Sequence, residues 1–406
     1  MPHKNAVYNV AGNIVFLFAQ WLMTIVVVRL SGYYDAGTLS IAITLTGIFY
    51  IISNYNMRVF QVADIDNRYD NRDYILARVL TIFTGFFACG ISLIFLGYGA
   101  ASNAVILLYM CYKSFESISD AYYGLYQKSD QFVYICVSMC AKGVVGIVAF
   151  TVFMRVTASL SVSLLVMAAA IAFVIFLYDY PRIRKYTGSR GHINATVLRR
   201  AGRILVVCLP LMLVMITQPI LQAIPRLIFE RRYSTELFGI YSSIAIPCAI
   251  ITLFASCAIL PYVPHFASLY QSKDNKRFLS SLGATVGIIV VFGIVALIGA
   301  YFLGEWALVL LFGEGVRSYV GVLPYVIIVM ICSSLIMVFN GIMTAMHKSV
   351  TLLALSLIGC LICAITAVFF IESWQMYGIA YSMIIAQTVQ IAAMAGTILF
   401  FTRKNS

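Results

Sequence analysis

Charged side chains are scarce in this sequence. Only 10% of the 406 residues are Asp, Glu, Lys or Arg, whereas an average globular domain has about a quarter. Because 62% of the residues are hydrophobic, a water-soluble fold would have to expose large apolar areas. The composition therefore excludes a soluble enzyme, a nucleic-acid-binding domain and a disulfide-stapled secreted module. A membrane-spanning helix needs about 20 apolar residues, so the chain suffices for about a dozen spans.

Histidine is also rare, with four residues in the whole chain. These histidines are scattered, and the sequence therefore predicts no metal centre. No P-loop, HExxH or nucleophile-elbow pattern occurs, so we expect a protein without ATPase or hydrolase activity and without a cofactor. Most of the ten cysteines lie inside apolar runs, where we expect them to pack as small apolar side chains.

Twelve apolar segments follow one another along the chain. They lack the alternation of apolar and polar residues that marks barrel strands, which favours helices. The first segment has no signal-peptide cleavage pattern, and we expect it to remain as the first span. We therefore predict an all-α polytopic membrane protein of about 12 transmembrane helices. The segments lie near 9–28, 36–57, 77–97, 103–126, 131–154, 158–178, 204–225, 237–260, 281–303, 321–345, 350–371 and 377–401.

Basic residues are distributed unevenly among the loops. If both termini lie on the inside, 19 of the 27 Lys and Arg residues fall on that side, six on the other side and two within spans. Cytoplasmic loops of membrane proteins carry such an excess, which predicts that both termini are cytoplasmic. The most basic loop, 181–203, lies at the midpoint of the chain. We expect it to link a six-helix lobe of residues 1–180 to a second lobe of residues 204–406, with its charges beside anionic lipid.

Two short patterns recur in both halves in the same order. An Arg-Leu pair, an acidic residue and a glycine connect the first two spans of each half, and a glycine followed by Lys-Ser ends the fourth span. Copies that share their orientation are related by an axis along the membrane normal, which predicts a central cavity and alternating access. The matched segments are Arg29 to Gly37 with Arg226 to Gly239, and Gly124 to Lys128 with Gly341 to Lys348.

The predicted fourth span carries Lys113, Glu116 and Asp120, whose spacing places them on one helical face. Three unpaired charges in lipid would cost about 9 kcal/mol, so this face must point to protein or water. Lys113 and Glu116 either form a structural pair or line a cavity for substrate or ions. Lys142 in the fifth span either pairs with Glu116 or Asp120 or contacts the ligand.

Other cations stand at the ends of spans. Arg29 and Arg226 either anchor the outer interface or bind a phosphate or pyrophosphate, whose two oxygens suit a planar guanidinium. Arg58 ends the second span in a polar stretch, where it is either a solvated loop charge or part of a polar site. Five tyrosines around the fourth span either stack on sugar faces or pack between helices. They are Tyr109, Tyr112, Tyr122, Tyr123 and Tyr126.

Several of these motifs resemble the Wzx-type polysaccharide flippases. Val28 to Gly32, followed by Asp35-Ala36-Gly37, is similar to the turn that opens the second span in that family. Arg58 to Asp64 is similar to its Arg-x-x-Gln-x-Ser-Asp stretch, with Ala63 in place of the serine. Leu311 to Gly313 and Ala345 to Lys348 are also similar. The sequence departs from the family by Ser31 before Gly32 and by His347, where a glycine is usual.

The resemblance implies a member of the multidrug/oligosaccharidyl-lipid/polysaccharide exporter superfamily, with two lobes around a central cavity. It implies a flippase in a bacterial inner membrane that moves a polyprenyl-pyrophosphate-linked oligosaccharide from the inner to the outer leaflet for O-antigen or capsule assembly. Expected partners are this lipid-linked oligosaccharide, membrane lipid and other polysaccharide assembly proteins, and no nucleic acid. By analogy, Arg29, Arg58, Lys113, Lys142 and Arg226 are candidates for anion contact, and Glu116 and Asp120 are candidates for ion coupling.

Two other functions are compatible with the sequence. A cation-coupled drug exporter of the same superfamily would favour an acidic cavity, whereas the charges at membrane depth here are mostly basic. A membrane-embedded glycan polymerase or ligase would need a sizeable external loop, and the longest one expected here, 304–320, has about 17 residues.

Overall fold

The computed structural model describes residues 2–64, 66–187, 194–259 and 263–404, with side chains for 7–64, 66–185, 194–255 and 265–402. All regular elements in these ranges are helices, which confirms the predicted all-α fold. The chain forms two compact units, Met1–Ile216 and Thr217–Ser406. The boundary falls inside one helix, α9 (Ala195–Arg232). The predicted division at 181–203 stays a prediction, and by contacts the first unit extends beyond it.

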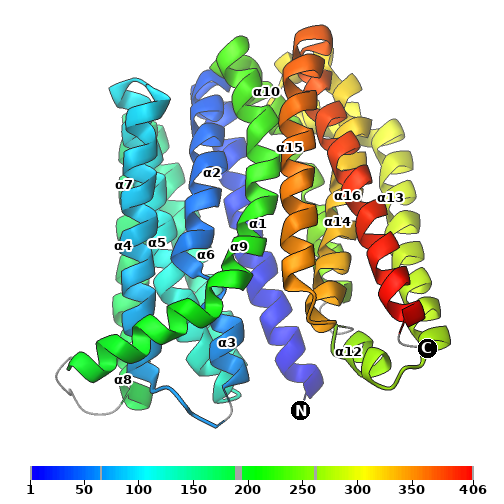
Figure 1. The fold of residues 1–406 in the computed structure, drawn as a ribbon. Helices are drawn as coiled ribbons and strands as arrows, with labels where there is room; N and C mark the ends of the chain where they lie inside the picture. The colour runs from blue at the N-terminus through cyan, green and yellow to red at the C-terminus, as the bar shows by residue number, and fades with distance from the viewer. Residues whose placement is uncertain (1, 65, 188–193, 260–262, 405–406) are drawn as a thin grey trace. The chain divides into compact units, whose positions relative to one another are not determined.

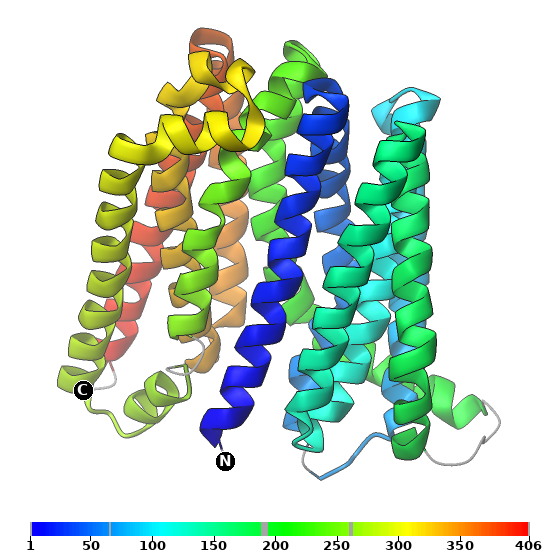
Figure 2. The ribbon, with the colours of Figure 1, turned by 180° about the vertical axis from the view of Figure 1, so that it is seen from behind.

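Unit 1 is a helical bundle centred on α5. In this unit α1 packs on α6, α6 packs on α7, and α5 contacts α2, α4 and α7. These long helices run side by side in both views (Figures 1 and 2). The elements are α1 (Pro2–Ser31), α2 (Tyr33–Asn54), α3 (Met57–Ala63), α4 (Asn71–Leu96), α5 (Ala100–Lys128), α6 (Phe132–Thr157), α7 (Leu160–Val174), the π-helix η1 (Ile175–Asp179) and α8 (Tyr180–Thr187).

The spans agree with those expected from hydropathy. Eleven helices in the described part of the chain are long and apolar enough to cross a membrane. The predicted fourth span is not among them, but it corresponds to α5, a helix of 29 residues. Its low hydropathy comes from charged and polar side chains in a helix that other helices surround. Charge at these positions is tolerated because the helix is not lipid-facing on that side.

The second span ends in a sharp break. The sequence predicted one segment over 36–57, whereas α2 ends at Asn54 and α3 begins at Met57. The two residues between them, Tyr55 and Asn56, both have left-handed backbones with φ of 52° and 48°. Such conformations are rare for residues other than glycine and cost free energy, so the surrounding contacts must hold this break in place.

The first turns of α9 lie across one end of unit 1 (Figure 1). Ala201, Ile204 and Cys208 face the unit and pack in a buried cluster that includes Met57 and Tyr74. Arg200 on the same helix pairs with Asp70 at 3.0 Å and lies 3.8 Å from Asp73. The end of the predicted linker is therefore part of unit 1 rather than a free connection.

Unit 2 continues from α9 with α10 (Thr235–Cys248), α11 (Ile250–Ile259), α12 (Val263–Gln271), α13 (Asn275–Phe312), the 3-10 helix η3 (Glu314–Val322), α14 (Leu323–Ala345), α15 (Ser349–Trp374) and α16 (Met376–Lys404). The predicted external loop 304–320 is wrong, because α13 runs to Phe312 and η3 follows at once. Arg317 pairs there with Glu305 at 3.1 Å and Glu314 at 2.6 Å, so these charges compensate one another at the surface.

The cysteines of the described residues are free thiols. Cys360 and Cys363 have the spacing of a metal-binding pair, but their sulfur atoms lie 3.3 and 3.4 Å from the carbonyl oxygens of Thr217 and Leu221. They therefore pack α15 against α9. In the described part of the chain, no group of three or more His, Cys, Asp or Glu could hold a metal ion.

Candidate functional site

Charged residues from five elements of unit 1 gather around α5. The ion pair expected between Lys113 and Glu116 is present, with 2.7 Å between Nζ and Oε2. Tyr50 on α2 donates its hydroxyl to Glu116 at 3.0 Å. The Lys113 amine also lies 5.0 Å from the ring centre of Tyr50 and 5.1 Å from that of Tyr112, within the range of cation–π attraction. Lys113 is thus fully engaged by its neighbours.

Asp120, one turn further along α5, is shared by two arginines. Its Oδ1 lies 3.3 Å from Arg58 on α3, and its Oδ2 lies 2.9 Å from Arg78 on α4. Arg58 also donates to the side chain of Gln127 from two nitrogens, at 3.0 and 3.2 Å. The interpretation of Arg58 as a solvated loop charge is therefore wrong, since this side chain points into the bundle and is 24% exposed.

Arg78 belongs to the site but was not among the residues predicted from the sequence. It is one of the 19 basic residues counted on the inner side, yet its side chain is only 1% exposed. One nitrogen donates to the carbonyl oxygens of Ser53 and Asn54, at 3.2 and 2.5 Å, where α2 ends. Because the last carbonyls of a helix have no partner within it, a guanidinium there satisfies them and opposes the negative end of the helix dipole. Arg78 therefore stabilises the break between α2 and α3.

Lys142 on α6 has a partner that the sequence did not suggest. Its amine lies 3.1 Å from Oδ2 of Asp179, not beside Glu116 or Asp120, and the two side chains are 3% and 0% exposed. Ser138 donates to the same oxygen at 2.9 Å, and the ring centre of Tyr123 is 4.6 Å from the amine. Asp179 ends the π-helix η1, a wider turn that often occurs at functional sites.

These side chains surround a cavity of about 140 Å³ within unit 1. Arg58, Lys142, Glu116 and Asp120 contribute polar walls, and Tyr123 adds an aromatic one. The lining comes from α1, α2, α3, α5, α6 and α7 and consists of Asn13, Phe16, Tyr50, Arg58, Glu116, Ser119, Asp120, Tyr123, Met139, Lys142 and Ile171. Four of the seven predicted site residues thus line one cavity, and Lys113 joins it through Glu116.

The cluster carries one excess positive charge. Its cations are Arg58, Arg78, Lys113 and Lys142, and its anions are Glu116, Asp120 and Asp179, which leaves four positive against three negative charges. Because Lys113 and Lys142 each have a carboxylate of their own, the excess lies where Arg58 and Arg78 share Asp120. A cation with half a counter-charge beside a cavity attracts an anion.

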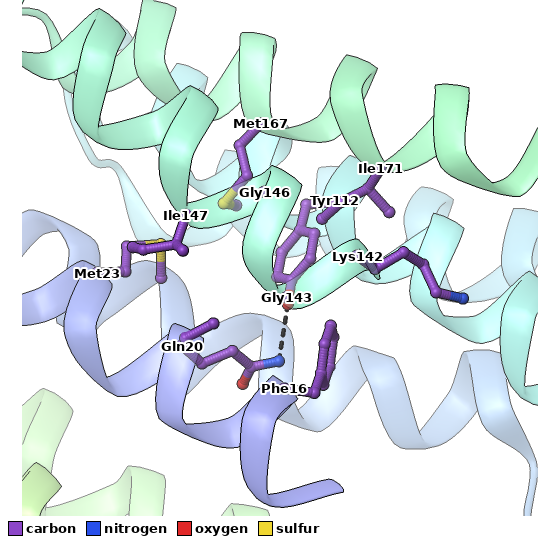
Figure 3. Close-up of a pocket in the computed structure, with 11 residues that line it drawn as sticks. Phe16, Gln20, Met23, Tyr112, Lys142, Gly143, Gly146, Ile147, Met167 and Ile171 are labelled. Atoms are coloured by element: carbon purple, nitrogen blue, oxygen red, sulfur yellow. Dashed lines mark hydrogen bonds between the residues drawn. The ribbon is translucent and has the colours of Figure 1, made fainter. Parts of the chain in front are cut away.

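A smaller pocket of about 20 Å³ lies next to this cavity, between α1, α5, α6 and α7 (Figure 3). Gln20 donates to the hydroxyl of Tyr112 across it at 2.7 Å. The stem of Lys142 borders the pocket, while its amine points away from Gln20 and Gly143 (Figure 3). Room for about one water molecule makes this a packing defect rather than a substrate site.

The remaining candidates lie elsewhere. Arg29, near the end of α1, is exposed and is not among the residues that line the cavity. Arg226 belongs to unit 2, where it is half-buried and hydrogen-bonds Tyr241 of α10. The roles predicted for both in anion contact stay predictions, as does ion coupling through Glu116 and Asp120.

The tyrosines around α5 mostly pack between helices. Tyr109, Tyr112 and Tyr126 are buried, and Tyr123 is both buried and part of the cavity wall. Tyr122 is half-buried. Packing is therefore the main role of this aromatic group, and Tyr123 is the member positioned to contact a ligand.

The whole chain was compared with known proteins. No protein-family model matches it. The chain is 26% identical over 392 residues to the capsular polysaccharide biosynthesis protein CapF of Staphylococcus aureus, covering 96% of this chain and 97% of that protein.

Solved transporters share the fold. The lipid II flippase MurJ in an inward closed conformation superposes with a TM-score of 0.68 at 12% identity, covering 97% of this chain and 87% of MurJ. The Vibrio cholerae MATE transporter VcmN superposes with a TM-score of 0.66 at 12% identity, covering 98% and 96%. The resemblance inferred from the sequence motifs is thereby confirmed. The chain has the fold of these transporters, the two-lobe fold that the resemblance implied.

Proposed function

We propose that the protein is a flippase for a polyprenyl-pyrophosphate-linked oligosaccharide, which it moves from the inner to the outer leaflet of a bacterial inner membrane. In this proposal both termini are cytoplasmic, the transport proceeds by alternating access, and the sugars serve O-antigen or capsule assembly beside other assembly proteins. The capsular relative, similar over nearly its whole length, supports a role in surface polysaccharide.

The observation that carries the proposal is the excess positive charge at the cavity of unit 1. A pyrophosphate is an anion with several oxygens, and a guanidinium can bind two of them at once. Arg58 lies on the cavity wall and has only a shared carboxylate as counter-charge. Tyr123 adds an aromatic ring beside it, at 5.7 Å from the guanidinium carbon, and such rings pack well against sugar faces.

The direct test is transport by the purified protein in liposomes. A fluorescent lipid-linked oligosaccharide is placed in both leaflets, and a membrane-impermeant reductant bleaches the label on the outer side. Wild-type protein should expose the inner pool to bleaching, whereas protein-free liposomes should not. Transport is tested with and without imposed ion gradients, since Glu116 and Asp120 are candidates for coupling. Failure to move the lipid under every condition would remove the proposal.

Two variants make the test specific for the cavity. Arg58→Gln removes the half-compensated cation, and we expect it to slow transport about tenfold or more, the loss typical of a charged hydrogen bond of 1.4 kcal/mol or more. Arg155→Gln makes the same exchange at an exposed position of α6, and transport should be unchanged. Equal rates for both variants would show that the cavity is not the anion site.

The drug-exporter alternative is tested in the same liposomes. A cavity with excess positive charge repels organic cations, so a cationic dye should not be transported faster than in protein-free liposomes. Uptake of the dye without movement of the lipid-linked sugar would favour the drug exporter instead.

A further inference from the structure

The two arginines that share Asp120 differ in how firmly they are fixed. Arg78 is fully buried, and its Nη1 lies within hydrogen-bond distance of four oxygens besides those of Asp120: the two carbonyl oxygens that end α2, the Oδ1 of Asn54 at 3.0 Å and the Oγ of Ser117 at 3.4 Å. These partners come from α2 and α5, so moving Arg78 would disturb both helices. Arg78 is a fixed counter-charge for Asp120.

Arg58 is held less tightly, since among the residues that the structure describes it hydrogen-bonds only one oxygen besides Asp120, the side-chain Oε1 of Gln127. It sits on α3, a seven-residue helix that follows the left-handed pair Tyr55 and Asn56. Its contact with Asp120 is longer than that of Arg78, at 3.3 Å against 2.9 Å, and its side chain is 24% exposed to the cavity. Of the two arginines, Arg58 is the one that can exchange Asp120 for another anion.

We propose that Arg78 is a positioning residue that keeps Asp120 compensated, so that Arg58 can leave Asp120 and bind the pyrophosphate of the substrate. This inference rests on the proposed function and gives Arg58, Asp120 and Arg78 each a distinct role. Asp120 holds Arg58 in place while the cavity is empty, and Arg78 holds Asp120 when Arg58 is drawn away.

The physical argument concerns the charge left behind. A partly buried carboxylate that loses its last counter-ion is strongly disfavoured. With Arg78 present, the departure of Arg58 leaves a neutral Arg78–Asp120 pair. Without the charge of Arg78, the same departure leaves Asp120 alone, so Arg58 stays on Asp120 and the anion binds less well. Removing the charge of Asp120 as well should free Arg58 again.

The test measures the binding of farnesyl pyrophosphate, a short polyprenyl pyrophosphate, to the purified full-length protein in detergent by calorimetry. Arg78→Gln should weaken binding at least tenfold. Arg78→Gln combined with Asp120→Asn should bind within about threefold of wild type. A merely structural role of Arg78 at the end of α2 predicts no such rescue, because both variants lack the same capping guanidinium.

Two single variants keep the inference testable if Arg78→Gln does not fold. Asp120→Asn leaves Arg58 without a counter-ion, so binding should be at least as tight as in wild type. Arg78→Lys keeps the charge near Asp120 and should bind nearly as tightly as wild type. Arg155→Gln is the matched control for the removal of an exposed arginine.

Three results with the variants overturn the inference. They are weaker binding by Asp120→Asn, unchanged binding by Arg78→Gln, and loss of binding by the double variant equal to that of Arg78→Gln alone. Wild-type protein that transports lipid-linked sugar in liposomes but does not bind farnesyl pyrophosphate also overturns it and leaves the proposed function intact. Absence of that transport removes the proposed function itself.

Discussion

The buried pair of Lys142 and Asp179 allows a quantitative test of the interior of unit 1. The perturbation is Asp179→Asn, which keeps the shape of the side chain and removes its charge. The amine of Lys142 then stays buried without a contacting carboxylate among the described residues, since Glu116 and Asp120, which line the same cavity, are each paired with another cation. Removing one partner of a buried ion pair typically destabilises a protein by about 3–5 kcal/mol, because the other charge is left uncompensated. We expect a loss in this range.

A double variant separates the stability that the ion pair contributes from the cost of leaving one charge without a partner. Lys142→Met costs a similar amount, since it leaves Asp179 without a counter-ion. Lys142→Met with Asp179→Leu replaces both charges by apolar side chains of similar size, and such exchanges are often neutral or stabilising. The double variant should therefore lose much less stability than the sum of the two single variants.

A second ion pair in the chain provides a matched control. Arg232 and Glu372 in unit 2 are also separated by 3.1 Å, but their side chains are 45% and 64% exposed. Water screens such a pair, so Arg232→Gln should cost less than about 1 kcal/mol. The distance is the same in both pairs, whereas their burial differs strongly.

The assay is reversible unfolding in mixed micelles, with increasing sodium dodecyl sulfate and far-ultraviolet circular dichroism as the readout. A loss below about 1 kcal/mol for Asp179→Asn, the range of exposed pairs, would refute the reasoning. So would a double variant as unstable as the two single variants added together, because the pair would then not be coupled.

Two further predictions concern packing and pH. Gly378→Ala places a Cβ 2.3 Å from the carbonyl oxygen of Phe370, so the backbone must move, and we expect the protein to lose about 1–3 kcal/mol of stability. Gly396→Ala on the same helix meets open space and should stabilise the protein by about 0.5 kcal/mol in the same unfolding assay. Burial raises the pKa of Asp64, but hydrogen bonds from two backbone amides and Tyr74 outweigh it and lower the pKa overall. The ionised carboxyl therefore stabilises the fold above the unfolded pKa of about 3.9, and this stability is lost as pH falls through the lower folded pKa. The melting temperature of Asp64→Asn should therefore fall less between pH 6 and pH 3 than that of wild type, and equal falls would contradict the prediction.

Local contacts of the site were predictable from the sequence. Lys113 and Glu116 are three residues apart on one helix, and a helix brings such side chains together whatever surrounds it. The twelve spans were predictable for a similar reason, since each depends on the hydropathy of one continuous segment. The fourth span was recognised even though its charges lower the hydropathy of α5.

Contacts between helices were not predictable in the same way. The partner of Lys142 lies 37 residues away at the end of a π-helix, and the extra residue in that turn rotates Asp179 relative to a regular α-helix. Nothing in the hydropathy of the segment signals this turn. The sequence therefore named Glu116 and Asp120, the carboxylates on the neighbouring span, as partners of Lys142.

Arg58 and Arg78 show a second limit. Both stand near the ends of apolar segments, where a count of basic residues assigns them to cytoplasmic loops. That count uses position along the helix but not the direction in which a side chain points. The signal that could have drawn attention to them is the break at Tyr55 and Asn56, because a helix that ends without a glycine needs another group to satisfy its last carbonyls.

The two halves of the predicted repeat differ in the charge of corresponding helices. If Gly124 corresponds to Gly341, the positions of Lys113, Glu116 and Asp120 on α5 correspond to Met330, Ser333 and Met337 on α14. Ser333 accepts a hydrogen bond from the amide of Gln387 at 2.8 Å, a neutral contact in place of an ion pair. A buried charge is costly without a partner. Charged side chains are therefore expected in both halves only if both halves use them. Because Lys113, Glu116 and Asp120 have no charged counterparts at these positions of α14, we expect this set to serve the substrate rather than the fold, as the proposed anion site in unit 1 requires.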